Sequence, residues 1–139
     1  MVASNAVGVA TSNVEAAYVA DVPAAPSAGP AVVIAETTST TIRLAFSALD
    51  ANDPVQTGGS PILSYNLQRT PALGVREASQ ITDTFFDVGG AVSNYSVSTA
   101  YTITDLAQGQ EYAFRYRGIN VNGPGAWSPI AIMRPATVP

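Results

Sequence analysis

The clearest pattern in this chain is an alternation of large apolar residues with small or polar ones in its second half. The alternating apolar residues are Tyr101, Ile103, Tyr112, Phe114 and Tyr116. A period of two places one set of side chains on the buried face of a strand and the other set on the exposed face. The pattern therefore predicts half-buried antiparallel strands at about 99–104 and 110–119, with a tight turn between them.

The same period recurs earlier in the chain, where Ile42, Leu44 and Phe46 alternate, and again at Tyr65 and Leu67. Helical periodicity is absent throughout. The remaining strands are expected near residues 31–36, 40–47, 61–70 and 127–134, with one or two edge strands around 76–83 and 84–88. These strands, separated by turn signals, predict an all-β fold, an immunoglobulin-like antiparallel β-sandwich of seven or more strands.

The inward-facing positions define a predicted core. Its members are Phe46, Tyr65, Leu67, Tyr101, Ile103, Leu106, Tyr112, Phe114 and Tyr116. The outward positions of the strand at 110–119 then hold Arg115 and Arg117. A register error of one residue would exchange the two sets, so the burial of these residues tests the prediction.

The spacing of turn and anchor residues closely resembles the second half of a fibronectin type III domain. The matching residues are Leu106, Gly109, Tyr112, Asn120, Gly123 and Ser128. The resemblance covers residues 24–137 and implies a sandwich in which the Tyr112 hydroxyl bonds to the backbone a few residues upstream. Two positions depart from the family pattern: Phe46 replaces a tryptophan and Gln108 replaces a proline. Neither change threatens the fold, because Phe46 is still a large aromatic residue and Gly109 keeps the turn free.

The two ends of the chain resemble each other. Residues 12–23 and 128–139 both run from a serine to a Val-Pro ending, with four identities in twelve positions. We interpret residues 1–22 as the last loop and strand of a preceding repeat plus a linker, ahead of a domain at 23–139. The alternative is a flexible N-terminal extension.

If the first interpretation holds, the segment from Thr11 to residue 20 has no vacant place in its own sandwich. Its unpaired backbone would then seek a sheet edge on another copy of the chain. The strand expected to pair in this way contains Thr11, Val14, Ala16 and Tyr18.

Composition excludes several classes of function. The chain has 139 residues, 47% of them hydrophobic, which is enough for about one domain with one core. It has no lysine, six arginines and ten acidic residues, for a net charge of -4, so nucleic acid is a poor partner. No apolar run approaches the ~18 residues of a membrane span.

Cysteine and histidine are both absent. Without them the chain cannot build a zinc site, a thiolate nucleophile or a Ser-His-Asp relay from its own residues. No glycine-rich phosphate loop is present either. We therefore predict that the chain is not an enzyme, and we assign it no catalytic residue and no cofactor.

Two acidic clusters invite a metal interpretation. Asp50, Asn52 and Asp53 bring together the oxygen ligands that calcium prefers. A solvated loop explains the same residues, and both interpretations stay open. Asp83 and Asp87 flank two phenylalanines, where a loop or edge strand is favoured over a metal site. We assign no metal ligand.

Trp127 is the only tryptophan and stands where the last strand is expected to begin. On the neighbouring strand Arg115 and Arg117 face outward, so the indole can lie across a guanidinium. This is similar to a reduced form of the Trp-Arg stacking of cytokine-receptor fibronectin domains. The cluster either stabilises the sheet edge between the last two strands or forms a contact surface for a protein or carbohydrate.

Two functional hypotheses follow. In the first, the chain is a structural or interaction module, one unit of a tandem extracellular or cell-surface array or filament that acts through protein–protein contacts. In the second, it is an adhesive or carbohydrate-recognition module whose site lies on the loops around Trp127. The charge-poor, cysteine-free composition suits a cell-surface protein, although an intracellular giant repeat protein is not excluded. Asn94 begins an Asn-x-Ser triplet, a glycosylation sequon that matters only in a secreted eukaryotic protein.

Overall fold

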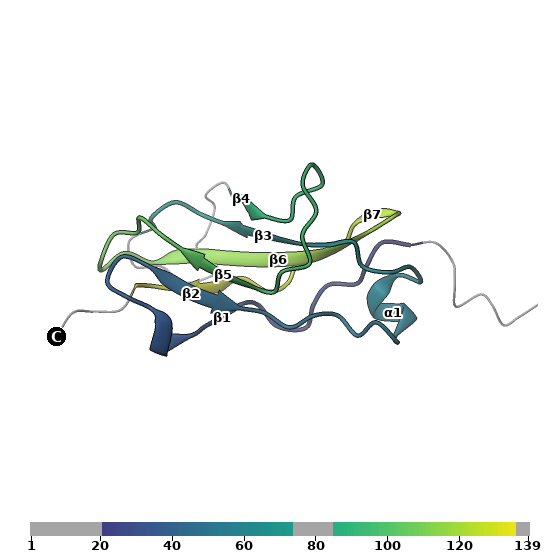
Figure 1. Cartoon of the computed structure of the whole chain (residues 1–139), viewed down its shortest axis with the longest axis horizontal. Coiled ribbons are helices and arrows are strands. Elements are labelled where there is room, and N and C mark those ends of the chain that lie inside the picture. The colour runs from purple at the N-terminus through teal and green to yellow at the C-terminus, as the bar shows by residue number, and fades with distance from the viewer. Residues whose placement is uncertain (1–20, 74–84, 136–139) are drawn as a thin grey trace, which may run out of the picture.

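A computed structural model describes residues 21–73 and 85–135 of the chain. In it, two antiparallel sheets pack face to face (Figure 1). The three-stranded sheet has the order β1-β2-β5, which are Ala31–Val32, Ile42–Ala45 and Ala100–Ile103. The five-stranded sheet has the order β4-β3-β6-β7, with β8 also paired to β6. Its strands are β3 (Ser64–Arg69), β4 (Phe86–Gly89), β6 (Tyr112–Asn120), β7 (Gly123–Pro124) and β8 (Ala131–Met133). The predicted immunoglobulin-like sandwich is confirmed.

The first predicted strand is shorter than expected. β1 ends at Val32, and a 3-10 helix, η3, follows at Ile34–Glu36. The Thr37 hydroxyl donates a hydrogen bond to the Val33 carbonyl across this turn, at 2.9 Å. A side-chain hydrogen bond of this local kind competes with the strand ladder, which explains the early end.

A one-turn helix, α1, at Pro54–Thr57 was not predicted. Its start is fixed by Asp53, whose carboxylate accepts a hydrogen bond from the Val55 N–H at 2.9 Å, and by proline at the first helical position. Gly58, with a φ of 75°, ends it in the left-handed conformation that glycine tolerates best. The lack of a helical period in the sequence did not predict this helix, because a single turn is too short to show a period.

Strand bounds also differ in the second half. The expected strand at 84–88 is β4, which includes Gly89, and the one at 76–83 lies outside the described residues. The expected last strand at 127–134 is reduced to β8, and the two residues of β7 pair separately with the end of β6.

The core lies between the sheets where the alternation placed it. All predicted members are buried except Tyr101, which is partly buried. At its centre the Phe46 ring stacks on Tyr116, with centroids 4.1 Å apart, and meets Tyr65 edge-on at 6.0 Å. Arg115 and Arg117 face outward, so the predicted register of β6 is confirmed.

The corner between β5 and β6 has the expected anchor. The Tyr112 hydroxyl accepts a hydrogen bond from the Ala107 N–H, five residues upstream, at 2.8 Å. Leu106 is buried beside it, and its N–H donates to the Thr40 carbonyl at 2.9 Å. Together these bonds tie the corner to the sandwich.

Candidate functional site

The outer face of β6 carries a stack of aromatic rings and guanidinium groups. The guanidinium carbons of Arg115 and Arg117 lie 4.1 and 4.0 Å from the centroid of the Trp127 ring. Alternate side chains on one face of a strand are about 6.8 Å apart, so the indole fits between the two guanidiniums. Phe85 extends the stack, with its ring centroid 4.0 Å from the Arg115 guanidinium carbon. We call Phe85, Arg115, Trp127 and Arg117 the ladder.

Side chains of β3 hold the ladder arginines in place. Arg115 donates from Nε and Nη2 to Gln68 Oε1, at 3.2 and 2.8 Å, and Arg117 Nε donates to Asn66 Oδ1 at 3.1 Å. The amide nitrogens of Asn66 and Gln68 in turn donate to Asp87 Oδ1, both at 3.0 Å. The two amides thus connect the guanidiniums to one carboxylate on β4.

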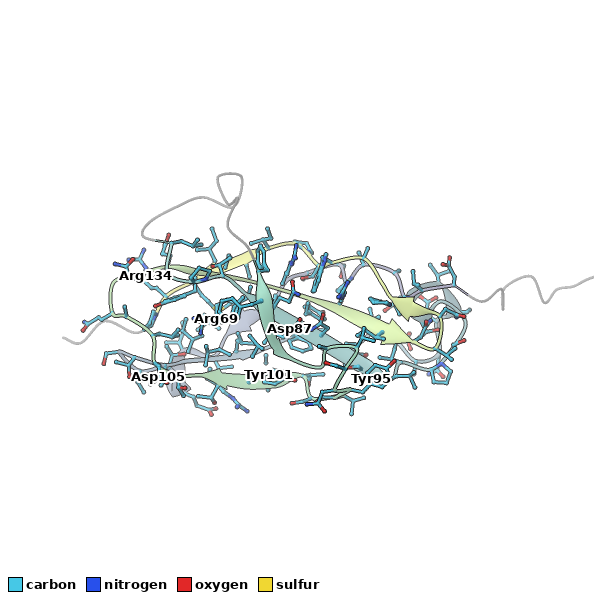
Figure 2. All side chains as sticks on the ribbon, turned by 90° about the horizontal axis from the view of Figure 1, so that it is seen from above. Arg69, Asp87, Tyr95, Tyr101, Asp105 and Arg134 are labelled. Carbon is cyan, nitrogen blue, oxygen red and sulfur yellow. The ribbon has the colours of Figure 1, made fainter. Side chains whose placement is uncertain are left out.

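Charge on this face is unbalanced. Arg115 and Arg117 form no ion pair within the described residues, whereas Arg43 and Arg134 pair with glutamates elsewhere. Burial lowers the pKa of Arg115 and of Arg117 from its ordinary value, but both remain charged at ordinary pH. Hydrogen bonds from Asn66 and Gln68 lower the pKa of Asp87. Figure 2 shows Asp87 near the middle of the molecule.

The ladder limits what Trp127 can do. Two guanidiniums lie over the Trp127 ring, so a sugar ring that stacks on the indole must compete with them. The guanidinium N–H groups that have no hydrogen-bond partner in residues 21–73 and 85–135 suit an acidic group better. The predicted stacking of Trp127 on these arginines is therefore present, while the contact role of Trp127, Arg115 and Arg117 stays a prediction. Phe85, Asn66 and Gln68 were not foreseen, because their part depends on the pairing of β3 with β4 and β6.

At the α1 end of the molecule, the chain enters the domain through a tightly held segment. The Asn120 side-chain amide donates to the carbonyls of Asp21 and Thr57, at 2.7 and 2.8 Å, and the Asn122 amide donates to Asp21 at 3.0 Å. The Asp21 N–H donates to the Gly58 carbonyl at 3.2 Å. These bonds fix the direction of the chain from its first described residue.

The next residues of the entry segment are equally fixed. Pro23 is fully buried, and its carbonyl approaches Gly125 so closely that a side chain at Gly125 would collide with it. The Ala24 N–H donates to the Gln56 carbonyl at 3.0 Å. Sequence analysis identified a proline-stiffened linker but not its partners, because Asn120 lies 99 residues away from Asp21.

Two hollows open at the α1 end. A cleft of about 740 Å³ lies between the loop before α1, the loop before β3 and the loop between β4 and β5. Leu49, Ile62, Tyr65 and Val97 contribute apolar lining to it. A second hollow, of about 430 Å³, lies beside the entry segment and includes Val22 and Val55.

The acidic residues considered for calcium accept hydrogen bonds from their own loop and from α1. Asp53 caps α1 through Oδ1 and accepts from Gln56 Nε2 through Oδ2 at 3.1 Å. Asp50 Oδ1 accepts from the Asn52 N–H at 2.9 Å. Within residues 21–73 and 85–135 no cluster of three metal-binding side chains occurs. Asp87 belongs to the ladder network, and Asp83 lies outside the described residues.

Two further predicted sites have different outcomes. Asn94 is exposed in the turn after β4, where its N–H donates to the Ala91 carbonyl at 2.8 Å, and its glycosylation stays a prediction. The proposed pairing strand with Thr11, Val14, Ala16 and Tyr18 lies outside the described residues. The helices in the described part are single turns, and none has the length or apolarity needed to cross a bilayer.

Comparison with known proteins gives a consistent result. A family model described as "Fibronectin type III domain" matches residues 24–134. A solution structure of a fourth FNIII domain from a human protein is 16% identical, with a TM-score of 0.62, and the match covers 85% of this chain and 82% of that one. An Fn3-like protein from Clostridium thermocellum is 20% identical, with a TM-score of 0.55, and the match covers 85% of this chain and 99% of that one.

A longer structure is also similar. The twitchin kinase region from C. elegans is 21% identical, with a TM-score of 0.57, and the match covers 82% of this chain. The matched part is 17% of that region, so this chain corresponds to one segment of a multidomain protein there. At these identities the structural likenesses establish the fold alone.

Proposed function

The chain belongs to the fibronectin type III family, and we propose that it is a non-catalytic structural module, one unit of a tandem extracellular or cell-surface array or filament. Domains of this family commonly serve as structural or interaction modules in such arrays. The partners of this unit would be neighbouring repeats or other copies of the chain.

One observation carries this proposal: the held entry segment and the exit of the chain lie at opposite ends of the molecule. Asp21 is bound beside α1, at the right of Figure 1, and Arg134 lies at the left in Figure 2, which is turned about the same horizontal axis. Units linked through such ends form a row. A bound entry segment also sets the direction from which a preceding unit arrives, which a loose tether would not do.

The sequence of the N-terminal segment supports the same proposal. Its similarity to residues 128–139 makes it the last strand of a preceding repeat, and such a strand needs an edge to pair with. β5 offers an edge, since among the described residues it pairs only with β2. Thr11, Val14, Ala16 and Tyr18 would then bind β5 of another copy, in a head-to-tail contact that can propagate as a filament.

Deleting residues 1–20 tests the proposal. We expect the truncated protein to unfold at the same denaturant concentration as the full chain, because Asp21 and the entry segment remain. Self-association of the full chain, measured by sedimentation velocity over a range of concentrations, should be lost in the truncated protein. Loss of folding on truncation would show that the segment belongs to its own domain and would remove the repeat interpretation.

A second candidate is an adhesive or carbohydrate-recognition module that uses the surface around Trp127. It is favoured by the guanidiniums of Arg115 and Arg117, which stack on Trp127 and form no ion pair in the described residues. A saccharide bearing carboxylates or sulfates should then change the fluorescence of Trp127, the only tryptophan. An Arg117→Ala variant should abolish that change, and an unchanged spectrum in the parent would exclude this candidate.

A further inference from the structure

Exposed apolar side chains gather around the point where the chain enters the domain. Val22, Val55 and Val121 expose 37%, 76% and 75% of their surface. Val22 and Val55 line the same hollow of about 430 Å³. Val121 follows Asn120, whose amide holds the Asp21 carbonyl. We call these three valines the entry patch.

The opposite end of the molecule has a hollow of its own, lined by apolar side chains and by the Arg134–Glu111 ion pair. It measures about 430 Å³ and includes Ile34, Ile132 and Pro135. Ile34 in η3 exposes 77% of its surface. Arg134 and Asp105 mark this end of the molecule in Figure 2. Both ends of the unit thus present apolar groups that its own fold leaves uncovered.

The length of the connecting chain decides how close two units must lie. In the proposed repeat, Thr137 takes the place of Asp21, because Ser12 and Ser128 mark the same position. β8 ends at Met133, so residues 134–136 alone separate the last strand of one unit from the held entry residue of the next. Four Cα steps span at most about 14 Å, which is too short to separate two domains.

From these observations we infer that the C-terminal end of one unit docks directly on the entry patch of the next. The occupant of the patch is the end with the Ile34 hollow, from the preceding unit of the same chain. This inference rests on the proposed tandem array. A small apolar contact suffices, because the covalent link makes the docking intramolecular and supplies a high effective concentration.

The test uses the full chain extended by a second copy of residues 24–139, so that Pro139 takes the place of Pro23. NMR relaxation of backbone amides reports the tumbling time of each unit. We expect one shared tumbling time for both units. A Val55→Asp change in the second unit, which places a charge in the contact, should cause loss of the shared time.

Val92→Asp in the second unit is the matched control. Val92 is also an exposed valine, but it lies in the loop after β4 and does not line the hollow beside the entry segment. It should leave the shared tumbling time unchanged. Val121→Asp, on a different loop of the entry patch, should reproduce the effect of Val55→Asp. Agreement between the two variants would exclude a local distortion of α1 as the cause.

The remaining outcomes separate the inference from the proposal beneath it. If both units fold but tumble independently in the parent tandem protein, docking is refuted while the array stands. If the second unit does not fold, the repeat boundary is wrong, and both the docking and the proposed array are refuted. Equal effects of Val55→Asp and Val92→Asp would also overturn the docking, because the contact would then not involve the entry patch.

Discussion

The sandwich interior and the α1 end are both rich in apolar side chains, but they differ in what covers them. In the interior, Phe46 and Tyr116 stack on each other and are closed off by strands of the same chain. At the α1 end, Val55 and Val121 face solvent although the chain there is tightly hydrogen bonded. Fold stability accounts for the first group. The second group adds little to the packing of one unit, and we infer that a neighbouring unit covers it.

This difference predicts that the cost of a substitution follows how completely the unit covers the side chain. The interior should show the largest cost. Phe46→Ala should destabilise the domain by about 3–5 kcal/mol and Leu106→Ala by about 2–5 kcal/mol, from lost apolar transfer plus a cavity. Equilibrium denaturation measures both. A loss below about 1 kcal/mol at either site would mean that the interior is not packed as described.

The β5–β6 corner offers a sharper comparison between two tyrosines. Tyr112→Phe removes the acceptor for the Ala107 N–H and should cost about 0.5–1.5 kcal/mol. The hydroxyl of Tyr101 is the one buried side-chain polar atom without a partner in the described residues. Tyr101→Phe should therefore be neutral or up to about 1 kcal/mol more stable. Equilibrium denaturation of both variants checks this comparison. Equal losses of stability would refute the claim that only the Tyr112 hydroxyl is hydrogen bonded.

The ladder is half covered and should show a smaller effect. A double-mutant cycle between Arg117→Ala and Trp127→Ala should give a coupling free energy of about 0.5–1 kcal/mol. A cycle between Arg43→Ala and Trp127→Ala is the control, since Arg43 pairs with Glu36 and not with the indole. Additive losses in the first cycle would show that the stack contributes nothing to stability.

Replacing Asp87 should lower the stability of the fold by a small amount that depends on pH. Because Asn66 and Gln68 lower its pKa in the folded state, the ionised carboxylate stabilises the fold above the usual aspartate pKa near 4. That contribution is lost as the pH falls through the lowered folded pKa. The stability difference between the parent and Asp87→Asn should therefore be present at pH 6 and shrink below about pH 4. A difference that grows on acidification would contradict the network.

Sequence alone predicted the inner face of the sandwich because burial repeats every second residue along a strand. Tyr112, Phe114 and Tyr116 were placed correctly for that reason. α1 was missed although Asp53 and Gly58 are ordinary signals of a helix start and end. The oxygens of Asp53 had been considered as calcium ligands, and one sequence cannot distinguish a cap from a ligand.

The parts of the surface that matter most here depend on contacts between distant residues. Asn120 holds Asp21 from 99 residues away, and Phe85, the residue before β4, reaches Arg115 on β6. Such contacts follow from strand pairing and leave no local pattern in the sequence. The stacking of Trp127 on its arginines was predictable because the expected strand order brings the segment before the last strand alongside the strand that carries them.

The central claim is that a neighbouring unit packs on the apolar side chains of the entry patch. The most direct measurement is the change in unfolding free energy caused by Val55→Asp, obtained by equilibrium denaturation. It is made in two settings, the single chain and the second unit of the tandem protein. The claim predicts a change within about 0.5 kcal/mol in the single chain, as for an ordinary surface site, and a clear loss of stability in the tandem. Equal changes in both settings would contradict it.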